Sequence, residues 1–348
     1  MKFKAQDTAP IADVCLLLEG TWPYVRGGVS SWVNQLILGL PEMTFSVFFI
    51  GGQKSAYPKR QYAIPPNVVH IEEHFLESSW TAGRAVMSAK REGPRDQINA
   101  LHEFFHHPGT PLPEDGARVL DILAAGSVTL DDVLHSRASW EAVTDGYTHH
   151  CSDPSFVNYF WTVRTMQAPL MMLCEAAMRM PRARALHSIS TGYAGLLGSI
   201  LQARWNCAYL LSEHGIYTKE RKIDLAQANW ISESPDEALK TGINSDVNYV
   251  RRLWIRFFER IGLLAYRSAN PITALYDGNR QRQVADGADF ARTLVIPNGI
   301  AMDVWASSIE QRPAGIPLTV GLVGRVVPIK DVKTFIRAMR GVISAIPE

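Results

Sequence analysis

The chain has 348 residues, of which 47% are hydrophobic and 20% are charged, and its formal net charge is +1. The length predicts two domains or one large one, and the apolar content is sufficient for a sizeable core. The near-zero charge offers no electrostatic basis for nucleic acid or an anionic membrane surface as the main partner, so no nucleic-acid partner is expected.

The four cysteines are Cys15, Cys151, Cys174 and Cys207, and no two of them form a CxxC pair. Cys15 and Cys207 lie in apolar, strand-like runs, which favours reduced, buried thiols over disulfides or metal ligands. The N-terminal segment lacks the apolar stretch of a signal peptide, and no run approaches the roughly 18 residues of a membrane-spanning helix. These features predict a cytoplasmic protein.

The first 71 residues alternate between apolar runs and loops. A strand is predicted over 13–18, because a continuous apolar run is typical of a strand buried on both faces. A loop rich in Gly, Pro and aromatic residues follows over 19–28, and apolar spacing then predicts a helix over 29–40. Further strands are predicted over 44–50 and 68–71. This order indicates the start of a doubly wound α/β sheet.

The pattern changes over 75–154, which is polar and rich in histidine and predicts a helical insertion. A long apolar helix is predicted over 156–180. Regular α/β alternation then returns, with strands over 184–188, 207–213, 271–274 and 293–296 and helices over 192–205, 247–269 and 276–285.

The C-terminal part begins a second structural unit. Pro and Gly mark a linker over 311–317, which follows an N-terminal domain over 1–310. An apolar strand over 318–323 and an amphipathic helix over 332–342 predict the opening of another α/β domain within 318–348. A βαβ unit needs roughly 30 or more residues, so we expect this domain to be incomplete and the chain to be inactive by itself.

The first motif that suggests chemistry is the pair Gly27-Gly28, which opens a helix just after a buried strand. Glycine allows a ligand to approach the backbone closely, and free N–H groups at a helix N-terminus favour anions. The pair does not form a GxGxxG fingerprint, which disfavours a dinucleotide site. A plain turn with a serine N-cap explains the same residues equally well.

A second motif, SEHGIYTKER over 212–221, follows an apolar strand. Open α/β sheets bind ligands at the carboxyl ends of their strands, so His214 could enter such a cleft as a donor or base, with Glu213 orienting its ring. A loop histidine with a structural hydrogen bond is an equally good interpretation.

Two further motifs lie toward the C-terminus. Arg325 and Lys330 flank a predicted strand–helix junction, where two cations can hold a diphosphate, although solvated charge at a helix start is the alternative. Asn298-Gly299 after a strand indicates a tight turn and no more.

The histidines of the insertion raise the question of a metal site. His102, His106 and His107 could share one helix face, but there is no HExxH motif and no fixed acidic partner. A solvated polar face is therefore favoured, and no metal is expected.

Taken in order, these motifs resemble the retaining GT-B glycosyltransferases of family four. The segments VCLLLEGTWPYVRGGVSSWV (14–33) and SEHGIYTKER (212–221), with the long insertion, are most similar to its PelF branch, which acts in Pel exopolysaccharide synthesis. The resemblance covers nearly the whole chain. It implies a GT-B-like fold with a Rossmann-like acceptor-side domain and the start of a donor-binding domain, whose Glu-x7-Glu motif would lie beyond residue 348.

The resemblance also implies roles for individual residues. Gly27 and Gly28 match the glycine loop that faces the donor diphosphate. His214 matches the histidine beside the transferred sugar, and Arg325 and Lys330 match the basic pair that holds the diphosphate. Residues near these motifs are candidate sugar or acceptor contacts: Glu213, Tyr217, Glu220, Arg221 and Asn298.

The expected activity is transfer of a sugar, with retention, from a nucleotide-diphosphate donor to a growing exopolysaccharide in biofilm formation. The donor is expected to be UDP-linked, with no cofactor. Expected partners are the nucleotide sugar, the polysaccharide acceptor and membrane-associated synthesis proteins, which would place the protein at the periphery of the inner membrane. A non-catalytic sugar- or protein-binding scaffold and a nucleotide-sugar epimerase of GT-B fold remain alternatives.

Overall fold

The structure is a computed structural model that separates into two units, Met1–Pro297 and Asn298–Glu348. Each unit is described by itself. The residues that the structure describes are 9–78, 92–152, 155–226, 249–300, 302, 306, 315, 319–324, 326 and 330–346.

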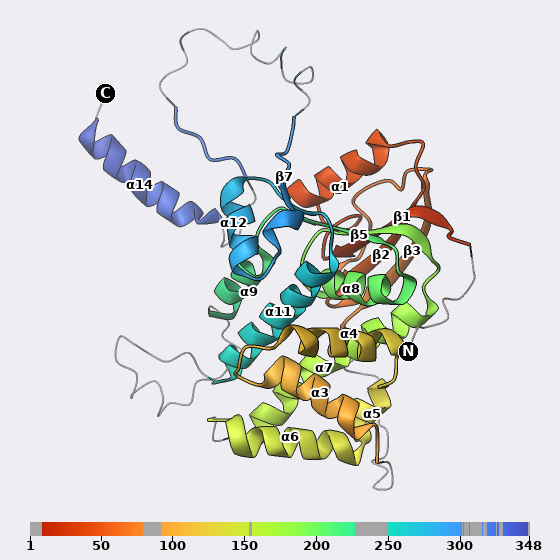
Figure 1. The fold of residues 1–348 in the computed structure, drawn as a ribbon. Helices are drawn as coiled ribbons and strands as arrows, with labels where there is room; N and C mark the ends of the chain where they lie inside the picture. The colour runs from red at the N-terminus through yellow and green to blue at the C-terminus, as the bar shows by residue number, and fades with distance from the viewer. Residues whose placement is uncertain are drawn as a thin grey trace. The chain divides into compact units, whose positions relative to one another are not determined.

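The first unit is built on one parallel sheet of seven strands in the order β3-β2-β1-β4-β5-β6-β7 (Figure 1). This order extends the 3-2-1-4-5-6 order of doubly wound dinucleotide-binding folds, so the predicted α/β Rossmann-like fold is confirmed. The strands are β1 (Ala12–Glu19), β2 (Phe45–Gly51), β3 (Val68–Phe75), β4 (Ala183–Ser188), β5 (Ala208–Glu213), β6 (Ile272–Ala274) and β7 (Thr293–Val295).

Strand β1 is apolar on both faces because helices cover both sides of the sheet. Leu16 and Leu18 belong to a cluster that includes Val33 and Ile37 of helix α1 (Gly28–Gly39). Leu17, which points to the other face, belongs to the larger cluster beneath the sheet. This double burial explains why the run has no polar alternation.

Helices α8 (Tyr193–Trp205) and α11 (Tyr249–Ser268) cover that second face, and α7 (Phe156–Arg179) packs against both of them (Figure 1). Two further helices follow strands of the sheet: α9 (Tyr217–Ala226) after β5 and α12 (Asp277–Ala285) after β6. Single 3-10 turns lie at Lys54–Ala56 and Phe290–Arg292.

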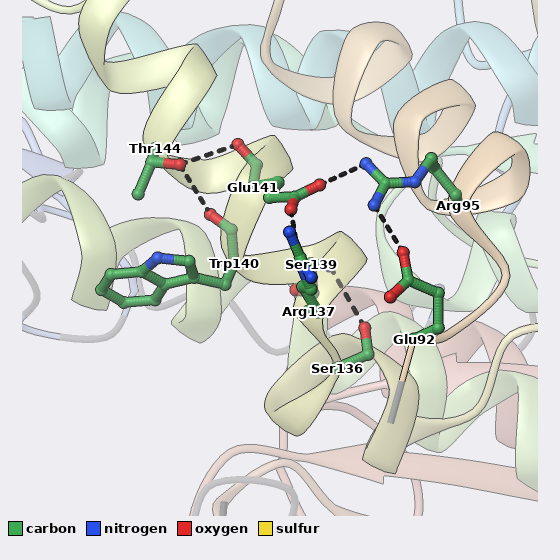
Figure 2. Close-up of polar contacts among 8 residues, drawn as sticks. All are labelled: Glu92, Arg95, Ser136, Arg137, Ser139, Trp140, Glu141 and Thr144. Carbon is green, nitrogen blue, oxygen red and sulfur yellow. Dashed lines mark hydrogen bonds and ion pairs between the residues drawn. The ribbon is translucent and has the colours of Figure 1, made fainter. Parts of the chain in front are cut away.

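Four helices within the predicted insertion pack on the outer side of α7, α8 and α11 (Figure 1). Arg95 and Glu141 form an ion pair between the first and the last of them, and Glu92 and Arg137 extend it (Figure 2). Exposed pairs of this kind contribute little stability each. The four helices are α3 (Arg95–His106), α4 (Pro113–Ala125), α5 (Leu130–His135) and α6 (Arg137–His150).

The expectation of a solvated face for the insertion histidines is wrong for two of them. His102 and His106 are only 7% and 3% exposed, and their rings meet edge to face at 4.7 Å. Burial lowers the pKa of His102 to about 4 and holds that of His106 well below its usual value. The two imidazoles are therefore neutral core groups of α3.

The described part of the second unit contains helix α14 (Val332–Ala345), which extends the predicted helix. Residues 319–323, which make up most of the predicted strand over 318–323, form no strand. A strand needs a neighbour for its backbone hydrogen bonds, and an apolar run cannot supply one.

No helix in the described part of the chain is both long and apolar enough to cross a bilayer. The four cysteines form no disulfide with one another. Cys15 and Cys174 are buried, whereas Cys151 and Cys207 are partly exposed.

Candidate functional site

A cavity of about 500 Å³ lies at the carboxyl ends of β1, β4 and β5 in the first unit. The chain leaves β1 toward β2 on one side and reaches β4 on the other, so this is the point where the strand order reverses. In open α/β sheets ligands bind in the crevice at such a point. Its polar lining comes from Glu19, Thr21, Tyr57, Ser190, Tyr193, His214, Tyr217, Glu220 and Arg221.

The β1 side of the cavity is formed by the last residue of the strand and the turn after it. Glu19 ends the strand, and Gly20 has φ +61°, a left-handed conformation that glycine adopts without strain. The amide of Gly20 continues the sheet by donating to the carbonyl of Ile50 at 2.9 Å. The turn therefore leaves Glu19 and Thr21 in the cavity lining.

The carboxylate of Glu19 lies between the first turn of α8 and helix α9. Its Oε1 accepts a hydrogen bond from the Tyr217 hydroxyl at 2.8 Å, and its Oε2 accepts a long one from the Ala194 amide at 3.4 Å. Burial raises the pKa of Glu19, and the hydrogen bond from Tyr217 and the charge of Arg221 oppose that rise. Glu19 is thus a desolvated carboxylate in contact with the cavity.

The β5 side begins with Glu213, which is 1% exposed and lies outside the cavity lining. Its carboxylate accepts hydrogen bonds from Tyr266 at 2.6 Å, Thr191 at 3.0 Å, Gln283 at 3.0 Å and the Tyr217 amide at 3.4 Å. Glu213 therefore fixes the loops and helices behind the cavity.

His214 follows Glu213 and lines the cavity. None of the four hydrogen bonds given for the Glu213 carboxylate goes to this ring, so the structure provides no hydrogen bond for the expected orienting role of Glu213. The ring instead meets Trp32 of α1 edge to face at 4.7 Å. Burial lowers the pKa of His214, so the imidazole is neutral at pH 7. A neutral imidazole offers a ligand one donor and one acceptor.

Helix α9 contributes the remaining charged groups. Burial raises the pKa of Glu220, which packs directly against Gly215. The Arg221 guanidinium lies 5.2 Å from the Tyr217 ring centroid and forms an ion pair with Asp224 at 2.8 Å. Side chains from β1 and α9 therefore meet at one wall of the cavity.

Polar atoms without partners gather around this cavity. Thr21 Oγ1, Ser190 Oγ, His214 Nε2 and Arg221 Nε are buried and have no hydrogen-bond partner among the described residues. Most buried polar atoms in folded proteins are paired, and exceptions call for a functional or strain-based explanation. Four exceptions on the lining of one cavity indicate a site arranged for a ligand.

The structure brings together four of the predicted site residues: His214, Tyr217, Glu220 and Arg221. Sequence reasoning missed Glu19, Ser190 and Tyr193, although the position of Glu19 at the end of a buried strand was a usable signal.

The predicted phosphate-binding glycines adjoin this cavity but are not part of its lining. Gly27 caps helix α1 and Gly28 opens it beside the cavity, whose lining includes the next residue, Val29. Lys330 is exposed in the second unit, Asn298 also belongs to that unit, and Arg325 lies outside the described residues.

No three His, Cys, Asp or Glu side chains within the described ranges are arranged to hold a metal ion. Two further cavities, of about 390 and 450 Å³, border α3 in the insertion. Neither lies at a strand end, and the unpartnered histidine atoms beside the second belong to the buried pair on α3.

The fold defines a Rossmann-like α/β domain, and the cavity at its topological switch point is the candidate ligand site. The chain belongs to the family described as "Domain of unknown function (DUF3492)", whose model matches residues 12–291. This match spans every strand from β1 to β6. No curated protein matches the chain.

Proposed function

We propose that the protein is a glycosyltransferase that moves a sugar from a nucleotide-diphosphate donor to a growing exopolysaccharide, with retention of configuration. The observation that carries this proposal is the cavity at the switch point, with His214 at the carboxyl end of β5. The match to DUF3492, which is associated with N-terminal domains of family-four-like glycosyltransferases, supports the same class.

The proposed chemistry needs stabilisation of negative charge, because the leaving nucleotide diphosphate gains charge as the sugar departs. Gly27 at the start of α1 has no side-chain cap, which suits its helix end to an anion. We assign diphosphate contacts to the amides of Gly27 and Gly28 and to the cations Arg325 and Lys330. This assignment uses no metal and no cofactor.

His214 would orient the sugar that is transferred. Its neutral ring can donate to or accept from a sugar hydroxyl without attracting the diphosphate. Tyr217, Glu220 and Arg221 would contact the sugar or the acceptor from the same cavity, and Asn298 is proposed as a further contact. Glu213 would act indirectly: its carboxylate accepts a hydrogen bond from the Tyr217 backbone amide and so holds Tyr217 in position.

A UDP-linked donor and the PelF-like role in exopolysaccharide synthesis complete the proposal. The partners would be the polysaccharide acceptor and membrane-associated synthesis proteins, with the enzyme in the cytoplasm at the periphery of the inner membrane.

The test is a turnover assay on the full-length protein with a panel of UDP-, GDP- and ADP-linked sugars. Nucleotide release that depends on one donor, and that is lost in His214→Ala, supports a transferase. The anomeric configuration of the product, determined by NMR, tests retention. Glycan binding without turnover of any donor would favour the binding scaffold, and isomerised nucleotide sugar without transfer would favour the epimerase.

A further inference from the structure

Glu19 ends β1 and Glu213 ends β5, the two strands that flank β4, and the two carboxylates differ in the hydrogen bonds that they accept. An ionised carboxylate has about four sites for hydrogen-bond donors. Glu213 fills them with four partners and is 1% exposed. Glu19 has one short bond, from the Tyr217 hydroxyl, and weaker ones from the backbone amides of Ala194 and Tyr193, and it is partly exposed in the cavity.

Glu213 therefore has a structural carboxylate, whereas the carboxylate of Glu19 can bind a ligand. Glu213 has no free acceptor site and no access to the cavity. Glu19 has only one short hydrogen bond in a desolvated environment, where a weakly satisfied carboxylate is costly. A ligand with hydrogen-bond donors could give the Glu19 carboxylate the further hydrogen bonds that the protein does not provide.

The charges of the lining select the kind of ligand. In the described lining Glu19 and Glu220 are acidic and His214 is neutral, and Arg221 is the one Lys or Arg. Arg221 forms an ion pair with Asp224 and its charge also reaches Glu19, so the three carboxylates around it outnumber it. Carboxylates attract hydroxyl hydrogens and repel another carboxylate. Neutral, hydroxyl-bearing rings therefore fit this cavity better than acidic ones.

We propose that Glu19 is a specificity-determining contact for the acceptor sugar, which it binds through hydroxyl hydrogens, and that it discriminates against sugars that carry a carboxylate. The hydroxyl of Tyr217 holds the Glu19 carboxylate in place. This inference rests on the proposed function in that it takes the cavity as a sugar site, but it needs no turnover.

The direct test is binding of tetrasaccharides to the 348-residue chain, measured by saturation-transfer NMR and calorimetry. The neutral probes are cellotetraose, maltotetraose and chitotetraose, and the acidic probe is tetragalacturonic acid. We expect at least one neutral probe to bind, and the acidic probe to bind at least about tenfold more weakly because of the like charges.

The decisive variants are Glu19→Gln and Tyr217→Phe. Glu19→Gln removes the charge and should weaken neutral-probe binding by about tenfold or more while it reduces discrimination against the acidic probe. Tyr217→Phe breaks the same internal hydrogen bond but keeps the carboxylate, so the preference for neutral probes should persist. If Glu19→Gln does not fold, Glu19→Asp serves instead: it keeps the charge but withdraws it from the ligand, and neutral-probe affinity should fall.

Three results would overturn the proposal: no probe binds, the acidic probe binds as well as the neutral ones, or the carboxylate variants leave binding and discrimination as in the wild type. A purely structural Glu19 would give the last result together with a lower melting temperature. Donor turnover without glycan binding would remove this inference and leave the transferase standing. Selective glycan binding without turnover of any donor would support this inference and contradict the proposed transferase activity.

Discussion

The Tyr217 hydroxyl donates a hydrogen bond of 2.8 Å to Oε1 of Glu19, and this bond joins residues 198 positions apart in the chain. It ties the first residue of α9 to the last residue of β1, on either side of the point where the strand order reverses. One wall of the candidate site depends on this pair, and both side chains line the cavity.

Gly192 should be required for this pair to form. A Cβ at this position would overlap the Tyr217 ring and lie 2.5 Å from Glu19 Oε2. Because both neighbours are held by their mutual hydrogen bond, Gly192→Ala should lower the free energy of unfolding by about 1–3 kcal/mol.

Gly28→Ala is the matched control, since a Cβ there meets no atom within 4 Å. Urea unfolding of both variants checks the prediction, and Gly28→Ala should be within about 1 kcal/mol of the wild type or slightly more stable. Equal stability of the two variants would contradict the prediction, because it would show that Tyr217 and Glu19 can move aside for a Cβ at position 192 without cost.

His214→Ala should lower turnover by roughly 100-fold or more while it leaves the fold intact. The His214 Nε2 has no hydrogen-bond partner among the described residues, so the substitution orphans no such partner. The lost edge-to-face contact with Trp32 is worth about 0.5–1.5 kcal/mol. Initial rates and thermal unfolding on one preparation separate the two effects. A variant that melts several degrees lower but turns over normally would make His214 a structural residue.

Lys330→Ala and Arg325→Ala should each reduce kcat/KM of the full-length enzyme by the equivalent of about 1.5–3 kcal/mol, because each removes a charge-assisted contact to phosphate. Lys330 is exposed, so its substitution should not change the melting temperature. Steady-state kinetics with the preferred nucleotide sugar measure the effect, with Lys333→Ala on α14 as a control of equal charge. Unchanged kcat/KM in either phosphate-site variant would remove that residue from the site.

Acid should destabilise the first unit through its buried histidines. Burial lowers the pKa of His187 from its usual 6.5 to about 4, and its Nε2 lies 2.9 Å from Ser212 Oγ. Below pH 6.5 the unfolded chain takes up a proton that folded His187 does not. Stability therefore falls as the pH decreases from about 6.5 to 4, by about 1.4 kcal/mol per pH unit for each such group.

His187→Gln tests this linkage. The free energy of unfolding should be measured in urea at pH 7, 6 and 5. Its decrease with falling pH should be smaller in the variant, by up to about 1.4 kcal/mol per pH unit, which is the contribution of one proton. His102, whose pKa is also lowered to about 4, still titrates in the variant. Parallel curves for variant and wild type would mean that His187 takes up its proton equally well in the folded protein.

Much of the first unit could be predicted because its elements carry local signals. The run over 13–18 became β1, and the run over 44–50 became β2, since a strand buried on both faces must be apolar throughout. The long periodic helix over 156–180 became α7. The apolar run over 318–323 also predicted a strand, but its described residues form none. A strand depends on backbone pairing with a neighbour, which the local sequence does not determine.

The sequence by itself determined that His214 follows a strand and lies close to Tyr217, Glu220 and Arg221, because all four belong to one short segment after β5. Only the tertiary structure decided that Glu19 joins them and that Glu213 is enclosed. It likewise decided that His102 and His106 are buried. The reason is physical: burial and hydrogen-bond partners arise when strands distant in the chain align their carboxyl ends, and a parallel sheet brings together residues that no sequence spacing relates.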